Sequence, residues 1–330
     1  MLAEVYDLEC LSNLFTYTGY CRSENKYYQF VIHDSRNDYI KLINHLKRDK
    51  LIMVGFNNEN YDYPLIHHIL NHINEYISLD GQSLAQKIYA KSQSLIDSEF
   101  NTIADKNKFI MQIDLFKIWH FDNKARHTSL KDLEFAMNMD NVEDMPISHT
   151  KWCTSDDIPI VLSYNKNDVH ATDLFLDITL GNTNNPLYKG ENKIKIREQI
   201  QSKFNINCLN YPDVKIGEQL MLHLYAQKVG SNPYEVKSRG GTPRDTIALK
   251  DCIPPWANFE TKEFNSIKKE FENTVIPGVN GEFKSSLVFH NQKLDYGIGG
   301  LHSCIKPGIY EADDYWTILD EDVGLVKWFY

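Results

Sequence analysis

The sequence lacks several features that would assign the chain to a class directly. Its six cysteines are scattered and form no C-x-x-C pair, which argues against a zinc ribbon and favours reduced thiols over a disulfide frame. No apolar run approaches the roughly 18 residues that a membrane-spanning helix needs, and there is no P-loop or G-x-S-x-G motif. Glu4, Asp7 and Glu9 interrupt the apolar stretch near the start, so we expect no signal peptide and a cytoplasmic protein.

Basic residues are outnumbered: 35 Lys and Arg stand against 45 Asp and Glu, which makes the formal net charge −10. This balance argues against a protein that coats nucleic acid without specificity. Residues 186–250 nevertheless hold more basic than acidic residues, whereas the segments on either side of them are acidic. The distribution fits a protein that holds phosphates in one place and metal ions in another, and it fits an uneven solvated surface equally well.

The chain is long enough for two domains, and its first half alternates between strand and helix patterns. The expected strands are 5–10, 26–34, 51–57 and 108–119, and the expected helices are 37–50, 61–77, 129–139 and 155–179. This alternation predicts an α/β domain over residues 1–185, with helices packed on a central sheet. The Gly-, Asn- and Pro-rich stretch 181–192 predicts a linker. Residues 186–330 are expected to form an α+β region, with a helix over 213–230 followed by β-leaning segments.

Two carboxylates lie two residues apart in the first expected strand, VYDLEC (5–10). Residues i and i+2 of a strand point to the same face, so Asp7 and Glu9 would repel each other, and near a core they would also lose hydration. An edge strand with a solvated face would tolerate the pair. The alternative is a divalent-cation site, which needs oxygen ligands from further elements.

Other residues are placed to complete such a site. Asp62 follows a strand near the start of a helix, and Tyr164 and Asp168 in YNKND share one helical face because they are four residues apart. If this helix crosses the sheet beside the first strand, the four carboxylates meet and cannot all stay ionised without cations. Two Mg²⁺ or Mn²⁺ ions would neutralise them and clamp a phosphodiester for attack by water, which the Tyr164 hydroxyl would orient. Taken singly, Tyr164 is equally a half-buried aromatic residue and Asp168 an exposed helix residue.

The order of these motifs resembles a known class of nuclease. D-x-E on a first strand, N-x-x-Y-D after a later strand and Y-x-x-x-D on a late helix resemble the three motifs of DEDDy 3′–5′ exonucleases, which have a ribonuclease H-like fold. The spacing is similar to that of the proofreading domain in family B DNA polymerases of phages and plasmids. The resemblance covers residues 1–185 and continues more faintly to about residue 322. It implies catalysis with two divalent cations by Asp7, Glu9, Asp62, Tyr164 and Asp168, of which the four carboxylates are the metal ligands.

The resemblance also implies residues that contact DNA. In the family, the asparagine and the aromatic residue of the second motif contact the single-stranded 3′ end; here these are Asn58 and Tyr61, and a base stacks well on such a ring. Lys131 matches a segment that supplies a phosphate-contacting catalytic lysine in relatives, although a solvated helix lysine explains it equally well. Cys10 stands where the family often has a threonine, so that threonine's DNA contact is not implied here.

The second half shows two further similarities to these polymerases. YGIGG (296–300) resembles the Tyr-Gly-Gly loop that binds template between the exonuclease and polymerase domains, which implies that Tyr296, Gly299 and Gly300 bind DNA; an ordinary glycine turn is the alternative. TILDEDVG (317–324) resembles the start of polymerase motif A and implies Asp322 as a polymerase metal ligand. The sequence departs from the family directly afterwards and supplies no fingers lysine or second palm carboxylate. We therefore expect no primer extension by this chain.

These observations together predict a metal-dependent 3′–5′ exonuclease joined to the first part of a family B polymerase palm. Its expected partners are single-stranded DNA 3′ ends, primer-template DNA and other replication proteins, and we expect a monomer. One alternative is a free-standing DEDDy nuclease that acts on DNA or RNA. The other is a catalytically idle module that binds DNA or the replisome, against which the four neighbouring carboxylates argue.

Overall fold

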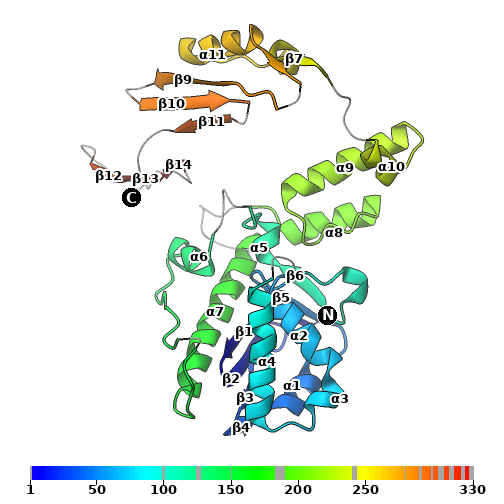
Figure 1. Ribbon diagram of the computed structural model, residues 1–330, viewed down its shortest axis with the longest axis vertical. Coiled ribbons are helices and arrows are strands. Elements are labelled where there is room, and N and C mark those ends of the chain that lie inside the picture. Colours follow the sequence, from blue (N-terminus) through cyan, green and yellow to red (C-terminus); the bar gives the residue numbers. More distant parts are fainter. Residues whose placement is uncertain are drawn as a thin grey trace. The chain divides into compact units, whose positions relative to one another are not determined.

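The structure is a computed structural model of the chain, which divides into two compact units, residues 1–225 and residues 226–330 (Figure 1). The first unit therefore extends past the boundary predicted between residues 185 and 186. The residues that the structure describes are 2–98, 101–123, 128–148, 150–182, 190–239, 244–278, 280–289, 292–298, 300–303, 308–311, 316–320 and 324–326.

A six-stranded mixed sheet is the centre of the first unit. In order across the sheet, its strands are β4 (Arg36–Asn37), β3 (Lys26–His33), β2 (Leu14–Cys21), β1 (Leu2–Leu11), β5 (Leu51–Gly55) and β6 (Met111–Asp114). The strands β1 to β4 pair antiparallel, whereas β5 and β6 continue the sheet parallel to β1. This mixed sheet with flanking helices confirms the predicted α/β class.

Helices cover both faces of the sheet (Figure 1). Tyr6, Leu8 and Cys10 of β1 point to one face, where they share a buried apolar cluster with four helices: α1 (Tyr39–Leu46), α2 (Asp62–Asn71), α3 (Ile73–Tyr76) and α4 (Gly81–Ile96). The opposite face is covered by α5 (Leu115–Ile118), α6 (Leu130–Ala136) and α7 (Ile158–Thr179). Because side chains alternate along a strand, Asp7 and Glu9 lie on this second face, under α7.

Three parts of the first unit differ from the expected elements. The sequence pattern did not predict β2, whose Thr16 and Thr18 are buried although they are polar, or the amphipathic helix α4. The expected strand 108–119 ends at Asp114, because the Asp114 carboxylate accepts the backbone N–H groups of Phe116 and Lys117 and starts α5. The expected helix 61–77 is divided between α2 and α3.

The helices α8 (Lys193–Phe204) and α9 (Asp213–Lys228) follow, and Arg197 connects α8 to the rest of the first unit. Only 1% of Arg197 is exposed, and its guanidinium donates to the carbonyls of Ile118 and Tyr211 and pairs with Asp213. Asn210 adds a second attachment, because it accepts the backbone N–H of Asp114 and donates to the backbone carbonyl of Gln112. These contacts explain why the first unit reaches beyond residue 185.

The second unit combines short helices with small antiparallel sheets, in agreement with the expected α+β composition. Its helices are α10 (Pro233–Ser238) and α11 (Lys262–Glu272). Its strands are β7 (Thr246–Ala248), β8 (Val275–Pro277), β9 (Lys284–Phe289), β10 (Gln292–Gly297), β11 (Gly300–Ser303), β12 (Gly308–Glu311), β13 (Trp316–Asp320) and β14 (Gly324–Val326). They form the sheets β7-β8, β9-β10-β11 and β12-β13-β14. None of the described helices has the length and apolar character that a bilayer span requires.

Candidate metal centre

The predicted acidic residues of β1 and α7 come together on the α7 face of the sheet. Asp7, Glu9 and Asp168 each offer one carboxylate oxygen, and these three oxygens all lie within 4.8 Å of one another. Glu9 is buried, while Asp7 and Asp168 are half-buried. The sheet holds Asp7 and Glu9 in place because they pair with Thr18 and Thr16 of the antiparallel neighbour β2. Such a group of hard oxygen ligands suits a divalent cation such as Mg²⁺ or Mn²⁺.

Asp62 approaches this group from the start of α2. It is 7% exposed, and its charge raises the pKa values of Asp7 and Glu9, so it lies within electrostatic reach of both carboxylates. It does not belong to the set of three oxygens that lie within 4.8 Å of one another. The structure therefore brings together three of the four predicted ligands as one group and places the fourth beside it.

Burial and neighbouring charges disfavour the ionisation of these four carboxylates. Burial is the largest cause for each of them, and it raises the pKa values of Asp7 and Glu9 well above their ordinary range. Burial, with the charge of Asp7, raises the pKa of Asp168 to about 8, and burial, with Asp114, raises that of Asp62 to about 8. A bound divalent cation would reverse this effect, because it stabilises the ionised carboxylates. The cluster is electrostatically unfavourable by itself and favourable around a cation.

Tyr164 lies on α7 one helical turn before Asp168, as the spacing predicted. Its ring is buried, and its hydroxyl lies within electrostatic reach of Asp168. Burial, followed by the charge of Asp168, raises the pKa of the phenol above its ordinary value. The hydroxyl therefore stays protonated at neutral pH and can donate a hydrogen bond beside the carboxylates.

The two second-motif residues predicted to contact DNA make internal contacts in the described structure. Asn58 is fully buried, its Nδ2 donates to Gln112 Oε1 at 2.9 Å, and it packs so closely on Gly55 that a Cβ there would lie 2.6 Å from Asn58 Cβ. The half-buried Tyr61 bonds through its hydroxyl to Ser92 Oγ of α4 at 2.6 Å. These contacts hold the loop between β5 and α2 in place, and the DNA contacts of both residues stay predictions.

Lys131 lies on α6 near the carboxylate cluster. Its ammonium group pairs with Asp144, and its side chain is 37% exposed. Its charge lowers the pKa of Asp168, which places it within electrostatic reach of the predicted metal ligand. Its contact with a phosphate stays a prediction.

Two polar residues near the cluster were not identified from the sequence. Glu134 of α6 is 1% exposed; its Oε1 accepts from Asn167 at 3.2 Å, while its Oε2 has no partner among the described residues. Its charge contributes to the raised pKa of Asp168. Asn165 of α7 donates to Asp7. Helical spacing could have indicated Asn165, three residues before Asp168, but the position of Glu134 depends on how α6 packs on α7.

The residues predicted to bind template in the second half are only partly described. Tyr296 is 7% exposed, its hydroxyl donates to Glu270, and its ring packs against Phe271 and Phe283 inside the second unit. Gly300 begins β11. Gly299 and Asp322 lie outside the described residues.

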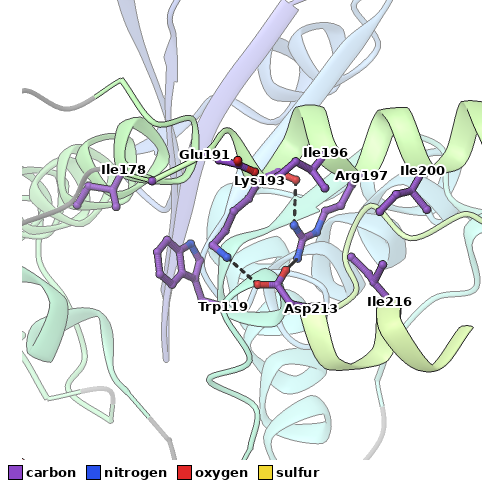
Figure 2. Close-up of a pocket in the computed structure, with 10 residues that line it drawn as sticks. Trp119, Ile178, Glu191, Lys193, Ile196, Arg197, Ile200, Asp213 and Ile216 are labelled. Carbon is purple, nitrogen blue, oxygen red and sulfur yellow. Dashed lines mark hydrogen bonds and ion pairs between the residues drawn. The ribbon is translucent and has the colours of Figure 1, made fainter. Parts of the chain in front are cut away.

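A separate cavity of about 550 Å³ lies between the end of α7 and the helices α8 and α9 (Figure 2). Four isoleucines and Trp119 line much of it, together with Lys193, Arg197 and Asp213. Lys193 and Arg197 both pair with Asp213, and Lys193 also lies over the Trp119 ring. The Ile178 in its wall comes ten residues after Asp168 in α7, about 15 Å along the helix axis. The cavity is therefore distinct from the carboxylate cluster.

No protein-family model matches the chain, and no curated protein matches it. Its function is therefore inferred from the geometry of its own residues.

Proposed function

We propose that the chain is a metal-dependent 3′–5′ exonuclease of the DEDDy class, in which the α/β unit has a ribonuclease H-like fold. The observation that carries the proposal is the convergence of Asp7, Glu9 and Asp168 oxygens within 4.8 Å of one another. Asp62 stands beside this group, and the Tyr164 hydroxyl lies within electrostatic reach of Asp168. Acidic ligands from β1 and α7 suit two-metal hydrolysis of a phosphodiester, and the neighbouring phenol could orient the attacking water.

The residues present fit two divalent cations, Mg²⁺ or Mn²⁺. Asp7, Glu9, Asp62 and Asp168 would hold them, since all four are oxygen ligands whose ionised forms need a cation nearby. When bound, such cations activate water and stabilise the charge that develops on the scissile phosphate. Tyr164 would orient the attacking water through its protonated hydroxyl, and Lys131 would favour the approach of phosphate to Asp168 by its positive charge.

We further propose that this nuclease is the proofreading domain of a family B DNA polymerase of the phage and plasmid type. The support is the order of the three motifs in the sequence, together with the similarity of YGIGG and TILDEDVG to polymerase segments. The second unit would then be the beginning of a palm. The substrates would be single-stranded DNA 3′ ends and the frayed ends of primer-template DNA, and the chain would act as a monomer with other replication proteins.

The proposal is tested by incubating the chain with 5′-labelled single-stranded DNA and Mn²⁺. We expect products that shorten stepwise from the 3′ end, and no products when EDTA replaces the metal. Asp7→Asn should lose this activity, whereas Asp49→Asn, which alters an exposed aspartate outside the cluster, should keep it. Intact DNA after incubation of the folded wild-type chain with Mn²⁺ would refute the nuclease. Shortening of 5′-labelled RNA alone would refute DNA as the substrate.

A further inference from the structure

We infer that Asn165 is a positioning residue for the metal centre, whose side-chain amide holds the carboxylate of Asp7 in the orientation that receives a cation. The inference rests on the proposed metal site. Asn165 is not one of the residues that the sequence motifs predicted for the site, which are the four carboxylates and Tyr164.

The contact that carries the inference joins α7 to β1. Asn165 Nδ2 donates to Asp7 Oδ2 at 2.5 Å, across 158 positions of sequence. Asn165 has no exposed surface, whereas Asp7 is half-buried. The amide is therefore fixed by the packing of α7, and it can restrict the rotation of a carboxylate that is less enclosed. When a cation keeps Asp7 ionised, this bond is charge-assisted and stronger than a neutral one.

The helix α7 supplies both the proposed metal ligand Asp168 and Asn165, the residue that orients Asp7. Asn165 and Asp168 are three residues apart in α7, so they lie on one face of the helix and both point toward β1. The Asn165 bond occupies Oδ2 of Asp7 and leaves Oδ1 as the oxygen that is free of this bond. Carboxylates that bind metal ions are commonly hydrogen-bonded by neighbouring side chains.

A second observation separates this role from that of an ordinary buried amide. In the described part of the chain, Asn165 Oδ1 has no hydrogen-bond partner although it is completely buried. Leaving a buried acceptor unpaired lowers the stability of a fold. An amide kept only to fasten α7 to β1 would be expected to satisfy both of its ends, as Asn13 does when it donates to the carbonyl of Cys153 and accepts the Cys153 N–H. In Asn165, only the Nδ2 group, which faces Asp7, makes a hydrogen bond among the described residues.

The inference is tested by titrating the full chain with Mn²⁺ in a calorimeter, which measures binding without turnover. Asn165→Leu removes the donor at similar volume, and we expect it to weaken Mn²⁺ binding about 10-fold or more, as loss of a residue that orients a metal ligand does. Asn165→Ala removes the same donor without adding bulk, and it should give the same result. The matched control is Asn13→Leu, which alters a buried asparagine outside the metal centre and should leave Mn²⁺ affinity within twofold of wild type. Unchanged affinity in either folded Asn165 variant would overturn the inference.

A measurement on the wild-type chain makes the test independent of the folding of variants. The side-chain amide resonance of Asn165 should shift during a Mg²⁺ titration with the midpoint of metal binding, while that of Asn13 stays in place. A stationary Asn165 resonance in a chain that binds Mg²⁺ would overturn the inference. If Asn165 proves necessary for Mn²⁺ binding but the wild type cuts no DNA, the proposed nuclease fails and the positioning role stands. If the wild type cuts DNA but the Asn165 variants bind Mn²⁺ as the wild type does, the positioning role fails and the proposed nuclease stands.

Discussion

Several carboxylates in this protein lie where their ionisation lowers the free energy of unfolding unless a cation binds between them. Asp7, Glu9 and Asp168 bring three oxygens within 4.8 Å of one another on a largely buried face of the sheet. The raised pKa values of these groups mean that folding makes their ionisation less favourable. Residues that lower stability in this way are typical of functional sites, because selection for stability alone would remove them.

Asp7→Asn should abolish most metal-dependent DNA hydrolysis, by about 10³-fold or more, since a bound metal lowers the barrier by several kcal/mol. Its melting temperature in EDTA should equal or exceed that of wild type, because the substitution removes one of several mutually repelling acids. The measurement is differential scanning fluorimetry beside the cleavage assay. A fall in melting temperature like that of a core mutation would show that Asp7 is a structural residue.

The substitution Tyr164→Phe should reduce DNA hydrolysis less than Asp7→Asn does. It keeps the buried ring and removes only the hydroxyl proposed to orient the attacking water, so we expect activity to fall roughly 10- to 100-fold, the value of one hydrogen bond to a charged group. Single-turnover cleavage of labelled DNA at saturating Mn²⁺ measures the step directly. An activity equal to that of wild type would contradict the proposed role of the phenol.

The pH dependence of stability follows from the raised pKa of Asp168. Between pH 4 and about pH 8 the unfolded chain has released the Asp168 proton while the folded chain still holds it, so this group lowers the free energy of unfolding as pH rises. In EDTA, Asp168→Asn should therefore gain stability relative to wild type across this range, and the difference should grow with pH. Urea denaturation at pH 5, 6, 7 and 8 measures it. A difference that shrinks with pH would contradict the assignment.

At the scale of elements, the loops at the carboxyl ends of β5 and β6 are held together by polar side chains. The Asp114 carboxylate accepts the backbone N–H groups of Asn57 and Glu59, and burial raises the pKa of Asp114 to about 6. Asn210, which precedes α9, reaches the same place and donates to Glu59 as well as to β6. The positions of Asp62 and Tyr61 at the start of α2 depend on this framework.

Asn210→Ala should destabilise the chain by about 2 kcal/mol, because three hydrogen bonds are lost and a buried backbone N–H is left without its acceptor. The matched control is Asn207→Ala, in the same connection between α8 and α9; Asn207 is exposed and makes one bond to Asp105. Urea denaturation of both variants measures the difference. Equal stabilities would show that the connection does not fasten α8 and α9 to the sheet.

At the scale of the whole molecule, the basic stretch 186–250 is shared between the two units. Its first part belongs to α8 and α9, whereas Lys237, Arg239, Arg244 and Lys250 belong to the second unit. If the second unit holds DNA as part of a palm, its cations add phosphate contacts that the first unit does not have. The two units can therefore be separated by experiment at the end of α9.

A chain that ends after Lys228 should keep the exonuclease activity on short single-stranded DNA and bind primer-template DNA more weakly than the full chain. Because fewer phosphates are neutralised, the logarithm of its affinity should also fall less steeply with the logarithm of salt concentration. Fluorescence anisotropy across a KCl series measures both quantities. Identical affinities and slopes for the two chains would refute a DNA-binding role of the second unit.

Local sequence patterns were sufficient to predict the α/β class of the first unit, the long helix α7 and the placement of Asp7, Glu9 and Asp168 on elements that could meet. These features depend on local periodicity, which residues two apart in a strand or four apart in a helix express directly. The sequence pattern did not show β2 or α4, nor that the first unit continues through Arg197 and Asn210. Threonine and arginine are residue types typical of the surface, so the burial of Thr16 and Thr18 and the internal partners of Arg197 could not be predicted from local pattern. Only the tertiary structure placed Asn165 against Asp7 and Glu134 beside Asp168, because contacts between distant residues depend on how α6 and α7 pack on the sheet.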